Sequence, residues 1–297
     1  MILKTGSISE LQDLLPKSRE VDAVSLNAVA DLIEHVPEDM TATLQAGMTL
    51  AELQSHLAKA GQWLPVDPPD AVTIGELLVN DLNGPRRFCY GTIRDWVIGL
   101  AVVLPDGRLI RNGGKVVKNV AGFDLCRLFV GSRNELGIIV EASFKLLPLP
   151  EMEVCLVKPC DSLDQADALL ETIWNSALQP TLLDLYRLDG APLKLVVGFA
   201  GPSTDVEAQS GTVVDLGFAT GASLEYDELF RRTTFNFTSV APGKLVSTLQ
   251  ALGNEPFVAR AGNGVIYHAS ANPPGIPLPN LQKRVKDIFD PDRVLVG

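Results

Sequence analysis

The sequence predicts an α+β protein of two domains, and three observations indicate it. A chain of 297 residues with 46% apolar residues can bury a sizeable core and exceeds the usual size of one domain. Helical and strand patterns alternate along the chain without a fixed repeat. Two prolines, Pro148 and Pro150, end a strand pattern in mid-chain. We therefore expect one domain over residues 1–150 and a second over residues 151–297.

The first half of the chain is built of short elements. The sequence predicts a capped helix in SISELQDLLP, strands in AVSLNAV and TATLQAG, and an N-capped amphipathic helix in TLAELQSHLAKAG. Residues 66–95 are rich in turn formers around a short helix in TIGELLVNDL, and loops of this length are usually functional. The Pro-Asp-Gly turn in WVIGLAVVLPDGRLIR predicts a hairpin. A helix in NVAGFDLCRLFVG and a strand in LGIIVEASFKLLPLP follow.

The second half favours a compact α+β domain with an antiparallel sheet. We expect a helix in LDQADALLETIWNSAL, strands in TLLDLYRL and LKLVVGFAG, and a helix around residues 204–215. Further short strands and an amphipathic helix in PNLQKRVKDIFDP complete the chain.

Charge and cysteine usage exclude several classes of function. A net charge of -11 repels phosphate backbones and anionic lipid, so nucleic acid and membrane surfaces are poor partners. The four cysteines lack C-x-x-C spacing and a histidine cluster, which predicts reduced thiols and no metal site. The N-terminal residues lack a signal-peptide pattern, and no run of 18 apolar residues predicts a transmembrane segment. We expect a soluble, cytoplasmic protein.

Four blocks between Gly47 and Pro150 follow one another in a specific order. They are AGMTLAELQSHLAKAGQWLPVDPP, TIGELLVNDLNGPRRFCYGTIRDWVIGLAVVLPDG, GGKVVKNVAGFDLCRL and VGSRNELGIIVEASFKLLPLP. This order resembles the FAD-binding domain shared by vanillyl-alcohol oxidase, D-lactate dehydrogenases and glycolate oxidase subunits. The runs GPRR and GGKVVKNVAGFDL are most similar to those of glycolate oxidase subunits, in particular the smaller FAD-domain subunit.

The resemblance implies a fold, a cofactor and a set of binding residues. The fold would be an FAD-binding domain of the PCMH type, made of two α/β subdomains, followed by a smaller α+β cap-like domain. Glycines would let backbone N–H groups approach the FAD pyrophosphate closely, so that a Cβ at Gly84 or Gly137 would enter the cofactor's space. The residues that the resemblance places at FAD are Gly6, Ser7, Thr73, Ile74, Gly75, Gly84, Pro85, Tyr90, Gly91, Thr92, Asp95, Lys118, Gly122, Gly137, Ile138 and Ile139.

The first flavin loop of the family is reduced here to the short run Lys4–Ser7. It contains no histidine, so a covalent histidyl bond is excluded and FAD would be noncovalent. Glu76, Asn134 and Glu135 also stand where relatives usually carry glycine or threonine. A carboxylate pointing into a pyrophosphate site would cost binding energy unless it turned away. A degenerate FAD site in a noncatalytic assembly subunit therefore stays open as an alternative.

The resemblance implies a subunit of a glycolate oxidase complex that oxidises a 2-hydroxy acid to a 2-oxo acid. Its partners would be a larger FAD-binding subunit and an iron–sulfur subunit, through which it would reach the inner membrane face. Arg86, Arg87 and Lys118 could hold the substrate carboxylate. No catalytic base can be assigned to this chain, which disfavours a free-standing oxidase of an unrelated alcohol.

Overall fold

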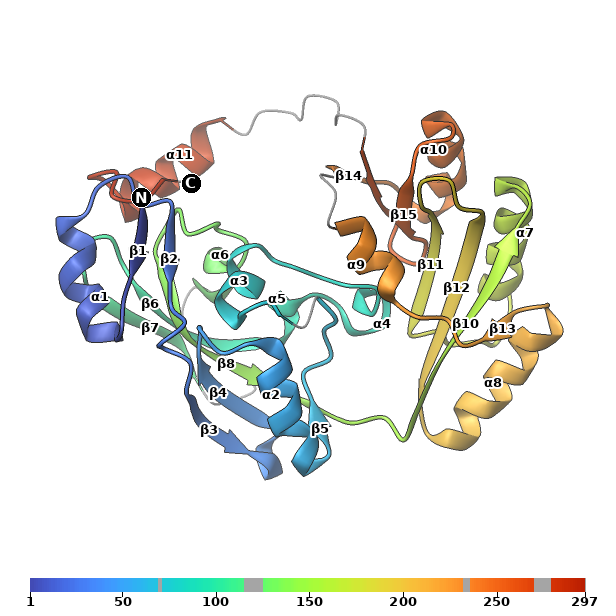
Figure 1. Ribbon diagram of the computed structural model, residues 1–297, viewed down its shortest axis with the longest axis horizontal. Coiled ribbons are helices and arrows are strands. Elements are labelled where there is room, and N and C mark those ends of the chain that lie inside the picture. Colours follow the sequence, from blue (N-terminus) through green and yellow to red (C-terminus); the bar gives the residue numbers. More distant parts are fainter. Residues whose placement is uncertain (69–70, 115–124, 232–235, 270–278, 297) are drawn as a thin grey trace. The chain divides into compact units, whose positions relative to one another are not determined.

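The computed structural model describes residues 1–68, 71–114, 125–231, 236–269 and 279–296. Residue contacts divide this chain into two compact units (Figure 1). Apart from the gaps just given, the first unit comprises Met1–Asn83, Thr92–Leu149 and Ile276–Gly297, and the second comprises Gly84–Gly91 and Pro150–Gly275. The expected boundary at residue 150 lies where the chain passes from the first unit to the second. The final helix, α11 (Pro279–Phe289), groups with the first unit.

The first unit begins with a parallel pair of strands, β1 (Ile2–Lys4) and β2 (Ala23–Ser25). Parallel strands need a crossover connection, and helix α1 (Ile8–Leu14) lies in it. The Ser7 hydroxyl accepts the Glu10 N–H at 3.1 Å and so caps this helix. The capped helix that the sequence predicts at this position is confirmed.

An antiparallel sheet of five strands forms the centre of the first unit, in the order β3-β4-β8-β6-β7 (Figure 1). These strands are β3 (Leu32–Val36), β4 (Thr41–Gln45), β8 (Ile138–Lys145), β6 (Val97–Val103) and β7 (Leu109–Gly113). The unit also contains the pair β5 (Gln62–Trp63) and β9 (Leu147–Pro148), and the helices α2 (Leu50–Leu57), α3 (Ile74–Val79), α5 (Ile93–Trp96) and α6 (Leu125–Phe129). The β6–β7 hairpin confirms the prediction from the Pro-Asp-Gly turn.

The second unit is an antiparallel sheet of seven strands in the order β13-β10-β12-β11-β15-β16-β14. Its strands are β10 (Met152–Cys160), β11 (Leu182–Arg187), β12 (Leu193–Gly201), β13 (Ala219–Thr220), β14 (Asn236–Ser239), β15 (Phe257–Arg260) and β16 (Val265–His268). One face packs on α7 (Leu163–Trp174), α8 (Ser203–Asp215) and α10 (Leu245–Leu252), and the other on α9 (Glu225–Arg231) (Figure 1). The short helix α4 (Arg87–Tyr90) belongs to this unit.

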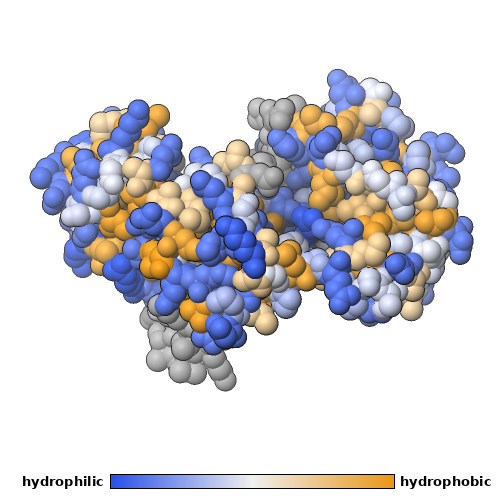
Figure 2. All heavy atoms as spheres, turned by 60° about the horizontal axis from the view of Figure 1, so that its bottom comes forward, coloured by the Kyte–Doolittle hydropathy of each residue, from blue (hydrophilic) through white to orange (hydrophobic). Residues whose placement is uncertain are grey.

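The α+β class that the sequence predicts is confirmed. The face shown in Figure 2 carries hydrophobic residues in patches among hydrophilic ones. Within the described residues, no helix combines the length and the apolar composition needed to cross a membrane.

Candidate functional site

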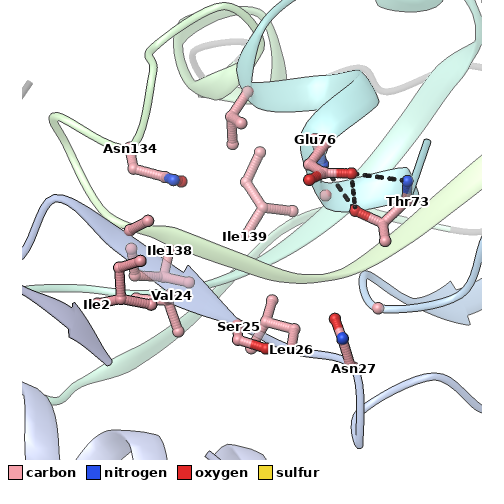
Figure 3. A pocket seen from close by; sticks show the side chains of 14 residues that line it. Ile2, Val24, Ser25, Leu26, Asn27, Thr73, Glu76, Asn134, Ile138 and Ile139 are labelled. Atoms are coloured by element: carbon pink, nitrogen blue, oxygen red, sulfur yellow. Dashed lines mark hydrogen bonds between the residues drawn. The ribbon is translucent and has the colours of Figure 1, made fainter. Parts of the chain in front are cut away.

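A cavity of about 240 Å³ lies in the first unit, among the β1–β2 pair, the start of α3 and the start of β8 (Figure 3). Its apolar walls come mainly from Ile2, Val24, Val79, Ile138 and Ile139. Its polar side chains are Ser25, Asn27, Thr73, Glu76 and Asn134. Figure 3 shows Asn134 and Glu76 on one side of this cavity and Ser25 and Asn27 on the other. We call this space the α3–β8 cavity.

The wall at β8 is held by strand pairing. Ile138 and Ile139 lie opposite Val103 and Val102 of β6, in the middle of the sheet. The preceding turn places Asn134 at φ +64°, in the left-handed region that asparagine tolerates better than most residues. This turn carries the Asn134 side chain to the cavity.

Close backbone packing also shapes the cavity at Gly47. A Cβ at this position would lie 2.0 Å from the Leu26 carbonyl oxygen and 2.6 Å from that of Val29. Because backbone atoms cannot give way as a flexible side chain can, only glycine fits. Gly47 therefore lets β4 approach the turn that follows β2, and this turn provides Leu26 and Asn27 to the cavity.

The α3 edge of the cavity is closed by a capping box. The Thr73 N–H and the Thr73 hydroxyl each donate to Glu76 Oε2 at 3.0 Å, and the Glu76 N–H donates to Thr73 Oγ1 at 3.2 Å (Figure 3). The Ile74 N–H donates to the Met48 carbonyl at 2.8 Å, and the Gly75 N–H to the Ala46 carbonyl at 2.7 Å. The first four N–H groups at this helix start thus already have acceptors inside the protein.

The lining of the cavity fits one half of FAD better than the other. Apolar walls with Ser, Asn and Thr side chains suit the adenosine half of the cofactor, because a base packs on apolar surface and polar groups fix its orientation. A diphosphate fits poorly, since the lining contains the Glu76 carboxylate and no Lys, Arg or His. Small-molecule sites usually measure about 300–1,000 Å³, so this cavity would take a part of FAD.

Four of the predicted FAD residues meet in the cavity, namely Thr73, Gly75, Ile138 and Ile139. Ile74 is fully buried, and its side chain contributes to the core. A Cβ at Gly137 would lie 2.8 Å from Val102 Cγ1 and 3.1 Å from the Val103 carbonyl oxygen. A Cβ at Gly137 would therefore be directed at β6, while the assignment of Gly137 to the FAD site stays a prediction.

Other predicted residues lie elsewhere in the structure. In the first unit, Gly6 and Ser7 belong to the start of α1, where the Gly6 N–H donates to Glu10 Oε2 at 2.6 Å. Thr92 and Asp95 form the capping box of α5. Gly84, Pro85, Tyr90 and Gly91 belong to the second unit. Lys118 and Gly122 lie outside the described residues. The assignment of all these residues to FAD stays a prediction.

Tyr90 is partly buried, and this burial raises the pKa of its phenol to about 12. The charges of Cys89 and Glu153 act in the same direction, while Arg86 opposes them. Tyr90 therefore remains protonated at neutral pH and can exchange hydrogen bonds, but it cannot serve as a base.

The histidines do not contribute to the α3–β8 cavity. The rings of His35 and His56 lie 5.3 Å apart in the first unit. Burial, with His35 and Lys59 nearby, lowers the pKa of His56. His268 belongs to the second unit, where its Nε2 lies 2.9 Å from Thr238 Oγ1. The cavity is suited to binding, and its lining offers no histidine as a general base.

Sequence reasoning missed several residues that line the cavity, namely Ile2, Ser25, Asn27 and Gly47. From the sequence, Asn134 is notable only because it departs from the family pattern, and the pattern does not predict its place in the cavity wall. Asn134 itself was a usable signal for its turn, because asparagine favours turns and tolerates the positive φ that it adopts here. The strand in AVSLNAV was expected, but its place at the cavity carried no local signal, since it depends on the parallel pairing of β2 with β1.

Parts of this chain are similar to known proteins. Residues 12–113 match the family described as FAD binding domain. The glycolate oxidase subunit GlcD of Bacillus subtilis is 36% identical over 186 residues, which are 62% of this chain and 39% of that protein. The glycolate oxidase subunit GlcE of Escherichia coli is 39% identical over 128 residues, which are 42% of this chain and 37% of that protein.

A mitochondrial D-lactate dehydrogenase [cytochrome] of Saccharomyces cerevisiae is 32% identical over 167 residues, or 56% of this chain and 28% of that protein. The aligned regions thus span less than two fifths of these three relatives. Among solved structures, alkyldihydroxyacetonephosphate synthase superposes with a TM-score of 0.74 at 18% identity. The superposition covers 99% of this chain and 75% of that one. This likeness shows a shared fold.

Proposed function

We propose that this chain, whose residues 12–113 match the family described as FAD binding domain, is the smaller FAD-holding subunit of a complex that oxidises a 2-hydroxy acid to a 2-oxo acid. The observation that carries the proposal is the α3–β8 cavity, whose walls include residues from the same segments that the resemblance assigns to FAD. When bound, FAD supplies the hydride acceptor for such an oxidation.

The part of this chain in that function is to hold the adenosine half of the cofactor. Ile138, Ile139 and Val24 provide apolar surface for the base, and Asn27 and Asn134 provide amide groups for hydrogen bonds. In this proposal the binding is noncovalent, because the run Lys4–Ser7 contains no histidine for a covalent histidyl bond.

The partners in this proposal are a larger FAD-binding subunit and an iron–sulfur subunit. Two relatives that are 36% and 39% identical to this chain are named as glycolate oxidase subunits, which supports assembly into such a complex. The complex would work in the cytoplasm and reach the inner membrane face through its other subunits.

The flavin content of the purified chain tests the proposal. We expect the protein, after incubation with FAD and removal of the excess, to show flavin absorbance that acid precipitation releases completely into the supernatant. Flavin retained in the pellet would contradict noncovalent binding. A protein that takes up no FAD would contradict the FAD-holding role.

A second candidate is a noncatalytic assembly subunit, and the Glu76 carboxylate favours it because it occupies the N–H and the hydroxyl of Thr73 at the start of α3. Co-purification with the larger flavin subunit and the iron–sulfur subunit separates the two candidates. A stable complex in which this chain carries no flavin would support the assembly role. A complex in which it contributes its own FAD would support the redox role.

A further inference from the structure

The α3–β8 cavity carries a negative charge of its own. Glu76 contributes a carboxylate, and none of the residues that line the cavity is a Lys, Arg or His. The remaining polar side chains are neutral, and they include Ser25, Asn27 and Asn134. A ligand group with a negative charge would therefore meet a like charge without a counter-ion in the wall.

Glu76 also occupies two of the donors that an anion would need. Its Oε2 atom accepts both the N–H and the hydroxyl of Thr73 at 3.0 Å. The N–H groups of Ile74 and Gly75 are bonded to the carbonyl oxygens of Met48 and Ala46. A phosphate could bind at this edge only by displacing the carboxylate, since the other donors are held by buried backbone.

We propose that Glu76 is a specificity-determining residue of this cavity, which favours an uncharged adenosine group and discriminates against a diphosphate. Glu76 thereby limits the affinity of the chain for FAD. The inference rests on the proposed function, because it takes the α3–β8 cavity as the place of the adenosine half.

The variant Glu76→Gln isolates the charge. Glutamine can keep the capping box, because its side-chain oxygen accepts the same N–H and hydroxyl bonds. The chain provides a matched control in α2, where Glu52 Oε2 accepts the Thr49 N–H at 2.9 Å and the Thr49 hydroxyl at 2.7 Å. Glu52 does not line the cavity, so Glu52→Gln makes the same chemical change outside the site.

The affinities of FAD, ADP and adenosine are measured by titration calorimetry for the wild type and both variants. We expect the wild type to bind adenosine more tightly than ADP. Glu76→Gln should bind ADP and FAD at least tenfold more tightly, about 1.4 kcal/mol, with adenosine affinity unchanged. Glu52→Gln should leave all three affinities as in the wild type. Melting temperatures show whether each variant is folded.

Equal ADP affinity in the wild type and Glu76→Gln would overturn the inference, as would an equal gain in Glu52→Gln. No binding of adenosine to the wild type at millimolar concentration would overturn it too. If Glu76→Gln strengthens ADP binding but neither protein binds FAD, the discrimination against a diphosphate stands, while the proposed FAD-holding role and the limit on FAD affinity fail. If both proteins bind FAD equally tightly, the proposed function stands and the inference fails.

Discussion

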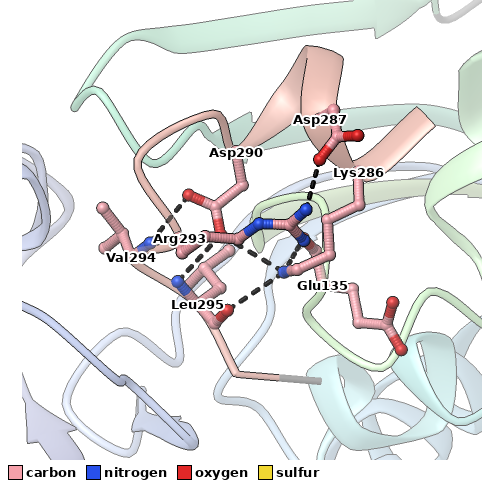
Figure 4. Close-up of polar contacts among 7 residues, drawn as sticks. All are labelled: Glu135, Lys286, Asp287, Asp290, Arg293, Val294 and Leu295. Atoms are coloured by element: carbon pink, nitrogen blue, oxygen red, sulfur yellow. Dashed lines mark hydrogen bonds and ion pairs between the residues drawn. The ribbon is translucent and has the colours of Figure 1, made fainter. Parts of the chain in front are cut away.

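Lys286 donates a hydrogen bond to the backbone carbonyl of Glu135 at 2.9 Å, and so joins the last helix to the turn before β8 (Figure 4). The same ammonium group donates to the Leu295 carbonyl at 3.0 Å and to Asp290 Oδ2 at 3.2 Å. Asp290 is fully buried and also accepts the N–H groups of Val294 and Leu295. Lys286 therefore links the C-terminal segment to Glu135, the residue that follows Asn134.

We expect Lys286→Met to destabilise the protein by about 2 kcal/mol, because hydrogen bonds from a largely buried charged group are lost. Adenosine affinity should fall as well, since the turn that carries Asn134 loses its anchor. Arg293→Met is the control, because Arg293 forms an exposed pair with Asp287 that is worth at most about 1 kcal/mol. Urea denaturation and calorimetry measure both effects. Equal losses in the two variants would contradict the anchoring role.

A substitution at Gly137 tests the finding that this residue faces β6. Gly137→Ala should cost about 1–3 kcal/mol of stability, because its Cβ would lie 3.1 Å from the Val103 carbonyl oxygen, which cannot move freely. Gly211→Ala in α8 is the control, since a Cβ there meets nothing within 4 Å and helix propensity favours alanine. Urea denaturation followed by circular dichroism compares them. If Gly137→Ala leaves the free energy of unfolding unchanged, the contact with β6 adjusts to the added Cβ without loss of stability.

Much of the fold could be predicted from local signals. Ser7, Thr49 and Thr73 each stand directly before an apolar periodic run, and each caps a helix. Turn chemistry likewise predicted the β6–β7 hairpin. Strand β10 was missed, because Lys158 and Pro159 interrupt its pattern.

The site was predictable only in part. Thr73, Ile138 and Ile139 belong to elements with strong local patterns. Their neighbours across the cavity come from β1 and β2, whose pairing depends on contacts between distant residues. The grouping of α11 with the first unit depends on such contacts too, including the one between Lys286 and Glu135. Sequence periodicity does not encode these distant partners.

The second unit contains a buried charge cluster whose loss should be costly. Arg260 is fully buried and pairs with Asp184 and Asp227, while the Tyr226 hydroxyl donates to Asp184 at 2.7 Å. Burial raises the pKa of Asp184 to about 6, against the opposing charge of Arg260.

We expect Arg260→Met to destabilise the protein by about 3–5 kcal/mol, because it leaves buried carboxylates without their cation. The exposed Arg111, which pairs with Glu141, gives the control Arg111→Met with a loss of at most about 1 kcal/mol. Thermal and urea unfolding at neutral pH provide the comparison. Similar losses in both variants would show that the cluster contributes no more than a surface pair.

The isolated chain should oxidise neither glycolate nor D-lactate at a useful rate, even with FAD bound. Removal of hydride from a 2-hydroxy acid needs a positioned base and a cation for the carboxylate. No such base has been assigned among the described residues, and Arg86 is engaged by Glu153 through two bonds of 2.8 and 2.9 Å. Stopped-flow absorbance follows the flavin after addition of either acid. Rapid bleaching would reveal a base that the structure does not indicate.

Hydrogen–deuterium exchange with and without FAD tests most directly whether the α3–β8 cavity receives the cofactor. We expect FAD to slow the exchange of backbone amide hydrogens in residues 23–27, 73–79 and 134–139. These segments provide the walls of the α3–β8 cavity. ADP should protect the same segments less strongly. FAD binding that leaves all three segments unprotected, while other parts of the chain exchange more slowly, would contradict the assignment of the cofactor to this cavity.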